Sequence, residues 1–154
     1  MLSALIFDVD GTLADTEHAH LAAFNAAFAA EGLDWRWDVP LYTELLTISG
    51  GKERIRHYWE RVNAGVRDID GTALDVLIDH LHEVKTAAYE QAVLDGAVRL
   101  RPGVLELIDE ARRAGITLAI ATTTSPVNIA ALLRQALGPD WRRAFAVIED
   151  ASTA

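Results

Sequence analysis

Two aspartates, Asp8 and Asp10, stand one residue apart directly after an apolar run, Ala4 to Phe7. Side chains two apart on an extended chain point the same way, so both carboxylates can face one small volume. Carboxylates that lie close together repel each other unless a cation or a shared proton lies between them. A divalent ion such as Mg²⁺ meets this need, because it prefers oxygen ligands and keeps several of its waters.

This pair could carry out phosphoryl transfer. With the ion bound, one carboxylate can attack phosphorus while the other moves the proton of the leaving oxygen. Gly11 allows the chain to turn sharply after the pair. The alternative is a solvated loop, because Asp-x-Asp-Gly is also a common turn composition.

The elements that must position these groups can be read from the apolar runs. Leu2 to Phe7 is a short apolar run that stops at polar residues, as is typical of a buried strand. Ile116 to Thr124 repeats this pattern and ends in three hydroxyls, those of Thr122, Thr123 and Thr124. Ligands of parallel α/β sheets bind beyond the carboxyl ends of the strands, which is where both polar clusters fall.

Helices are predicted between and after these strands. The first covers His18 to Glu31 and stops at Gly32. The further predicted elements are three or four helices within 44–89, broken at Gly50-Gly51 and Asp70-Gly71, a helix beginning at Pro102 and closed by Gly115, a helix capped by Ser125 and ended by Gly138, and a third strand at Phe145–Ile148. This order predicts an α/β fold with a parallel sheet whose first crossover carries a helical insertion.

Composition bounds the class of protein. The 154 residues, 51% of them apolar, suffice for one domain with a core, with or without a modest insertion. The net charge of −9 argues against nucleic acid and membrane surfaces as partners, although local cations could still bind a phosphorylated small molecule. No segment approaches the roughly 20 apolar residues of a membrane span, and the N-terminus lacks a secretory signal. The absence of cysteine excludes disulfides and fits a cytoplasmic protein.

The string Asp8-Val9-Asp10-Gly11-Thr12-Leu13, directly after an apolar strand, resembles the first motif of the haloacid dehalogenase-like phosphatases. The resemblance implies that Asp8 is the nucleophile and that Asp10 is the general acid and then the general base. It also implies Mg²⁺ held by the Asp8 carboxylate and the Asp10 backbone carbonyl. Thr122 resembles the second motif, a hydroxyl that binds the transferring phosphoryl group, with Thr123, Thr124 and nearby amides as helpers. The alternative for these threonines is ordinary filling of a strand.

The string Asp15-Thr16-Glu17-x-x-His20 and an insertion between about residues 15 and 98 resemble the branch of that family with a small helical cap, to which β-phosphoglucomutase belongs. Within it the likeness is closest to the CbbY-type phosphatases and spans essentially the whole chain. Such proteins remove the 1-phosphate from xylulose 1,5-bisphosphate, an inhibitor of Rubisco in carbon fixation. The implied architecture is a Rossmann-like core, residues 1–14 and 99–154, with a helical cap, residues 15–98.

Several residues of this cap could bind a sugar phosphate. Glu17 could accept hydrogen bonds from sugar hydroxyls, and His20 could orient Asp10 or the substrate. Lys52 with the amide of Gly51 could bind the phosphate that does not react, and Lys85 is the chain's other lysine. Arg54 and Arg56 are weaker candidates. The alternative for each cap charge is a solvated helix face, which is also the interpretation given to His57, His80 and His82.

Two further pieces of the family's site, a lysine and an acidic motif that completes the magnesium shell, have no clear match. Glu149-Asp150 is not assigned to the acidic motif, because no lysine lies between Thr122 and Glu149; the pair is expected to close the third strand. The chain therefore resembles the N-terminal two-thirds of an enzyme with an incomplete core, and we expect impaired catalysis and a tendency to self-associate. A phosphomutase and a non-catalytic fragment that binds sugar phosphates are the alternatives to a phosphatase.

Overall fold

The structure is a computed structural model that describes residues 2–62 and 71–153. The chain divides into two compact units, one of Met1–Ala19 with Glu90–Ala154 and one of His20–Tyr89. We call them the sheet unit and the helical unit and describe each by itself. The predicted assignment of residues 1–14 and 99–154 to a catalytic core, and of 15–98 to a cap, stays a prediction.

The sheet unit contains three parallel strands. They are β1 (Ala4–Phe7), β2 (Thr117–Ala121) and β3 (Val147–Glu149), and they lie in the order β1-β2-β3. Ile6 pairs with Ala119, and Ala119 pairs with Val147 on its other side. The predicted α/β class with a parallel sheet is thus confirmed. Each strand is shorter than the apolar run from which it was predicted.

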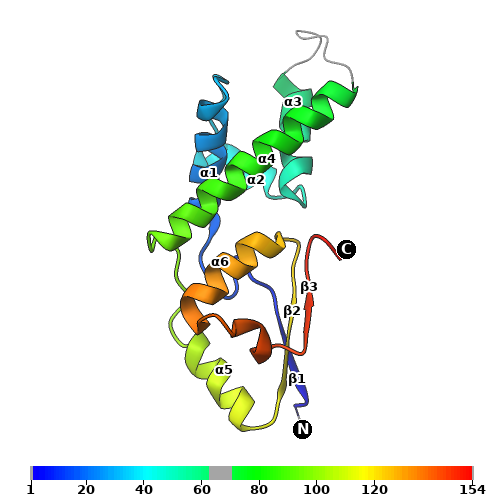
Figure 1. Cartoon of the computed structure of the whole chain (residues 1–154). Helices are drawn as coiled ribbons and strands as arrows, with labels where there is room; N and C mark the ends of the chain where they lie inside the picture. The colour runs from blue at the N-terminus through cyan, green and yellow to red at the C-terminus, as the bar shows by residue number, and fades with distance from the viewer. Residues whose placement is uncertain (1, 63–70, 154) are drawn as a thin grey trace. The chain divides into compact units, whose positions relative to one another are not determined.

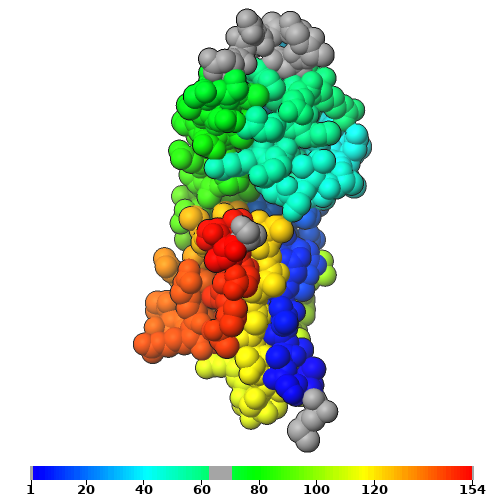
Figure 2. Space-filling view, turned by 90° about the vertical axis from the view of Figure 1, so that its right-hand side faces the viewer, coloured from blue at the N-terminus to red at the C-terminus, as the bar shows by residue number. Residues whose placement is uncertain are grey.

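Helices cover one face of this sheet. Figure 1 shows α5 (Val104–Arg113) and α6 (Pro126–Leu137) on the same side of the strands, with a short 3₁₀ helix, η1 (Trp141–Ala144), after α6. The buried strand residues Phe7, Leu118 and Ile120 alternate with exposed or half-buried ones. Within the described residues of the sheet unit the other face is bare of helices, and Figure 2 shows the three strands side by side on it.

Local signals explain where these helices begin. Ser125 caps α6 by accepting a hydrogen bond from the backbone N–H of Asn128, and Pro126 lies in the first turn, as the sequence predicts. The predicted start of α5 at Pro102 is two residues early. Gly103 has φ = 86°, a left-handed conformation that cannot continue a helix backwards, so α5 begins at Val104.

The helical unit is built from α1 (Glu17–Ala30), α2 (Val39–Leu45), α3 (Gly51–Val62) and α4 (Gly71–Leu94), of which α1 and α4 run past its limits. Aromatic side chains fill its core: the ring of Trp37 lies 4.7 Å from that of Phe24 and 4.9 Å from that of Phe28, centroid to centroid. The predicted break at Gly50-Gly51 is present. The predicted break at Asp70 lies outside the described residues.

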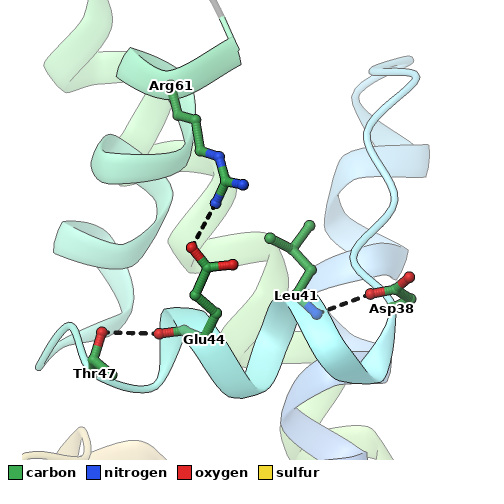
Figure 3. A network of polar contacts seen from close by, with 5 residues as sticks. All are labelled: Asp38, Leu41, Glu44, Thr47 and Arg61. Atoms are coloured by element: carbon green, nitrogen blue, oxygen red, sulfur yellow. Dashed lines mark hydrogen bonds and ion pairs between the residues drawn. The ribbon is translucent and has the colours of Figure 1, made fainter.

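Polar contacts cap both ends of α2 and link it to α3 by one exposed ion pair (Figure 3). Asp38 accepts a hydrogen bond from Leu41 N–H at 2.9 Å and so caps α2. Glu44, also on α2, pairs with Arg61 of α3 at 2.9 Å, and its carbonyl accepts from the Thr47 hydroxyl. No helix was predicted between Gly32 and Glu44, although Asp38 followed by Pro40 signals a helix start.

Candidate active site

A cavity of about 450 Å³ opens at the carboxyl ends of the strands in the sheet unit. It is lined by residues that follow all three strands: Asp8, Ala121, Thr122, Thr123, Glu149, Asp150 and Thr153. The structure therefore brings Asp8 together with two of the three threonines that the sequence singled out. This is the arrangement expected when parallel strands end at one edge of a sheet.

The two aspartates lie in a turn after β1. Because β1 ends at Phe7, the two-residue alternation of a strand does not extend to them, and Asp8 lines the cavity whereas Asp10 does not. Asp10 Oδ1 accepts a hydrogen bond from the fully buried Thr16 hydroxyl at 2.6 Å. Gly11, with φ = 73°, supplies the sharp turn. Thr16 thus helps to orient Asp10, a contact that was not predicted for it, whereas the predicted orientation of Asp10 by His20 stays a prediction.

Backbone hydrogen bonds hold the turn of Thr122 to Thr124 against the end of β3. The N–H of Thr122 donates to Glu149 O at 3.0 Å, and the N–H of Ala151 donates to Thr124 O at 3.1 Å. The N–H of Thr124 donates to Thr122 Oγ1 at 3.3 Å. The N-terminus of α6 follows directly, so its positive dipole end adds to the hydroxyls in favouring an anion.

Two acidic residues in the cavity wall were not predicted as site residues. Glu149 closes β3, as expected, and it lines the cavity together with the buried Asp150. Asp150 Oδ1 accepts hydrogen bonds from the backbone N–H and the hydroxyl of Ser152, at 2.8 and 2.6 Å. The lack of a lysine between Thr122 and Glu149 argued only against assigning these two residues to the family's acidic motif. Their proximity to Asp8 comes from the pairing of β2 with β3.

The negative charge of this cavity favours the binding of a metal cation. Three carboxylates and no basic side chain are among its lining residues, so a cation there would offset their repulsion. Over residues 2–62 and 71–153 no group of three or more acidic, histidine or cysteine side chains is arranged as a metal site. Mg²⁺ fits such a donor set, because it takes one or two protein oxygens and retains waters.

Glu17 begins α1, and its Oε2 atom is buried without a hydrogen-bond partner within the described structure. A buried carboxylate oxygen that accepts nothing is costly, and it is suited to a hydrogen-bond donor that the chain does not supply. This geometry is compatible with the predicted contact to sugar hydroxyls.

His20 and Lys85 lie together in the helical unit. Lys85 is 4% exposed, and its Nζ lies 3.0 Å from His20 Nδ1. The imidazole stacks on Tyr89 at 4.1 Å, and the ammonium lies 5.0 Å from the Phe24 ring centroid. Lys85 is therefore not on the solvated helix face that was the alternative for a cap charge.

Gly51 and Lys52 occupy the start of α3. Lys52 Nζ forms an exposed ion pair with Asp79 of α4 at 2.7 Å, and the hydrogen bond and charge of Lys52 hold the pKa of Asp79 below its usual range. Gly51 packs so closely against His82 that a Cβ would lie 2.8 Å from the imidazole. The interpretation of His82 as a surface residue therefore holds only in part, because the imidazole is half buried. His80, in contrast, pairs with Glu31 at 2.8 Å and is half exposed.

The arginines near Gly51 have structural partners. Arg54 donates to the carbonyls of Leu45 and Ile48 at 3.0 Å each, which satisfies the end of α2. Arg56 pairs with Asp75. These contacts occupy the guanidinium groups of two weaker candidates for phosphate ligands.

Comparisons with known proteins agree with this arrangement. A family profile described as haloacid dehalogenase-like hydrolase matches residues 2–153. The plasmid-encoded CbbY protein of Cupriavidus necator is 57% identical over 152 residues, which are 99% of this chain and 59% of that protein.

A crystal structure of CbbY from Rhodobacter sphaeroides in complex with phosphate superposes with a TM-score of 0.86 at 45% identity, over 100% of this chain and 65% of that one. A mutant of the same CbbY in complex with xylulose-(1,5)bisphosphate gives the same TM-score at 44% identity. The chain thus spans about 60% of the length of these relatives.

Proposed function

The chain belongs to the haloacid dehalogenase-like hydrolases, and we propose that it functions as a Mg²⁺-dependent sugar-phosphate phosphatase. The proposed reaction removes the 1-phosphate of xylulose 1,5-bisphosphate and gives xylulose 5-phosphate. One observation carries the proposal: Asp8 and the Thr122–Thr123 turn line one cavity at the carboxyl ends of the strands. The substrate is chosen because a CbbY with 44% identity was crystallised with this bisphosphate.

Asp8, Asp10 and Thr122 have chemical roles in the proposed reaction. An Asp8 oxygen attacks phosphorus, the bond from phosphorus to the sugar oxygen breaks, and Asp10 donates a proton to that oxygen. Asp10 then takes a proton from the water that hydrolyses the aspartyl-phosphate, which returns both residues to their starting states. The hydroxyl of Thr122 donates to a phosphoryl oxygen, and the positive dipole end of α6 stabilises the charge of the phosphoryl group.

Mg²⁺ would be held by the Asp8 carboxylate and the Asp10 backbone carbonyl, and it offsets the negative charge of the carboxylates and the phosphate when bound. The hydrogen bond from Thr16 keeps the Asp10 side chain in one orientation for its work on protons.

We further propose that five residues bind the rest of the substrate. Glu17 accepts hydrogen bonds from sugar hydroxyls, His20 with Lys85 orients a polar group of the substrate, and Lys52 with the Gly51 amide binds the second phosphate. The unpartnered Glu17 Oε2 supports the first assignment. Lys52 must exchange its exposed ion pair with Asp79 for the phosphate, a change that costs little because exposed pairs contribute little stability.

The test is phosphate release from xylulose 1,5-bisphosphate with and without Mg²⁺. It is measured on residues 1–154 and on a chimaera completed with the C-terminal region of the Cupriavidus necator CbbY. We expect Mg²⁺-dependent release by the chimaera and its complete loss in Asp8→Asn, because a carboxamide cannot form the aspartyl-phosphate. Asp109→Asn, which removes an exposed carboxylate on α5, is the matched control and should retain the activity. Activity that persists in Asp8→Asn would refute the proposed nucleophile.

A further inference from the structure

Asn128 is a polar residue in the buried face of α6. It is 4% exposed and lies among buried apolar residues of the same helix, including Ile129 and Leu132. Its Nδ2 atom donates to Thr124 Oγ1 at 3.3 Å, whereas its Oδ1 atom is buried with no hydrogen-bond partner within the described structure. One half of this amide is therefore satisfied and the other half is not.

Helix capping does not explain the amide. Ser125 already supplies the cap, because its hydroxyl accepts the hydrogen bond from the backbone N–H of Asn128 itself. A leucine, which has the same branching at Cγ, would place an apolar side chain here without burying an unpartnered carbonyl oxygen. The stability of the fold thus favours an apolar residue at position 128. What asparagine provides and leucine cannot is the hydrogen bond from Nδ2 to Thr124.

Through this bond the amide acts on the wall of the cavity. All three hydrogen-bonding parts of Thr124 are engaged: its N–H donates to Thr122 Oγ1, its carbonyl accepts from Ala151, and its hydroxyl oxygen accepts from Asn128. Thr124 is 8% exposed and is held from three directions. Thr122 Oγ1 accepts the Thr124 N–H, so its hydroxyl hydrogen points elsewhere and is available to donate.

We propose that Asn128 is a positioning residue that fixes Thr124 and thereby makes the Thr122 hydroxyl a hydrogen-bond donor into the Asp8 cavity. The ligand that such a donor serves is a tetrahedral oxyanion. Its identity as a phosphoryl group rests on the proposed function, whereas the positioning itself rests only on the hydrogen bonds of the turn.

The test uses Asn128→Leu, which keeps the branching at Cγ and removes the donor, and Asn128→Asp, which keeps the shape and replaces the donor by an acceptor. Gln135→Leu is the matched control, because Gln135 lies on the same helix and its amide donates to the Val93 carbonyl at 2.8 Å, away from the cavity lining. Two properties are measured on residues 1–154: hydrogen exchange of the Thr124 amide by NMR, and binding of tungstate, a tetrahedral oxyanion, by calorimetry.

We expect both Asn128 variants to speed exchange of the Thr124 amide about tenfold and to weaken tungstate binding by a similar factor, with an unchanged fold and no effect of Gln135→Leu. If Asn128→Leu does not fold, Asn128→Asp decides the result. Unchanged amide exchange in the folded Asn128 variants would overturn the positioning role. If the wild-type chain binds no tungstate, the phosphoryl site of the proposed function fails, and the amide exchange still decides the role of Asn128.

Discussion

Gly51 and His82 are packed so tightly that no side chain fits between them. A Cβ on Gly51 would lie 2.8 Å from both Cδ2 and Nε2 of the imidazole and 3.6 Å from the Phe24 ring. Gly51 has no positive φ, so space rather than backbone conformation requires glycine here. This contact joins the start of α3 to α4 and sets the place of the neighbouring Lys52.

Gly51→Ala is therefore expected to lower the free energy of unfolding by about 1–2 kcal/mol, because the strain of overpacking exceeds the gain in helix propensity. Gly71→Ala is the matched control: Gly71 also begins a helix, and a Cβ there meets nothing within 4 Å. This control should be neutral or stabilising. Urea denaturation of both variants checks the expectation.

A double variant tests whether His82 is the cause. Combining Gly51→Ala with His82→Ala removes the ring that the new methyl group meets, so the combined loss should fall below the sum of the single losses. Additive losses would show that the strain lies elsewhere, for example at Phe24.

The pKa of His82 supplies a dependence of stability on pH. Burial, followed by the charges of Lys85 and Lys52, lowers this pKa from 6.5 to about 4, although Glu53 and Asp79 act in the opposite direction. The unfolded chain therefore binds a proton between pH 6.5 and 4 that the folded chain does not, and stability falls as the pH drops through this window. Above pH 6.5 the residue has no such effect.

We expect this residue to cost about 1 kcal/mol of stability between pH 7 and pH 5, after allowance for its partial exposure. Denaturation curves of wild type and His82→Gln at both pH values measure the difference, which should shrink in the variant. His57→Gln, at an exposed histidine of α3, is the control and should keep the wild-type difference. If the stability difference between pH 7 and pH 5 shrinks equally in His82→Gln and His57→Gln, the effect comes from general surface charge.

The sequence predicted best those elements whose signals are local. The cap and first turn of α6 need only Ser125 and Pro126, and the strands need only short apolar runs that stop at polar residues. The site was predictable in part for the same reason, because Asp8 and Thr122 each follow such a run.

What could not be predicted depends on residues that are distant in the chain. Glu149 and Asp150 join the cavity only through the pairing of β2 with β3. His82 becomes half buried because α4 places it against Gly51, and no spacing in the sequence records that contact. Asn128 looks like any polar residue on a helix until its depth and its bond to Thr124 are known.

The pair of Lys85 and His20 predicts one imidazole tautomer. A lysine ammonium can only donate, so at a distance of 3.0 Å His20 Nδ1 must accept, and the ring proton then resides on Nε2. The ¹⁵N chemical shifts of the His20 ring should show this tautomer at pH 7. Lys85→Met, which keeps most of the volume and removes the donor, should allow a mixture of tautomers. A ring proton on Nδ1 in the wild type would contradict this reading of the contact.

The bare face of the sheet leads to the last prediction, that residues 1–154 self-associate. The side chains on that face are apolar in the centre: Ile6 is 70% exposed and Val147 is 50% exposed, and both pair with Ala119 across the sheet. Within the described residues the outer edge of β1 also has no partner strand. An apolar face beside an open edge favours pairing with a second chain.

Ile6→Thr should weaken this association by about tenfold, because it removes roughly two buried carbon groups yet keeps a β-branched residue suited to a strand. Val127→Thr is the matched control, since Val127 is 46% exposed but lies on α6 rather than on the sheet. Sedimentation equilibrium of both variants and the wild type over a wide range of concentrations measures the dissociation constants. The bare face drives association if only Ile6→Thr shifts the equilibrium toward monomer. A wild-type chain that stays monomeric at every concentration would show that Ile6 and Val147 are tolerated in water, and equal shifts in both variants would assign the association to exposed apolar side chains in general.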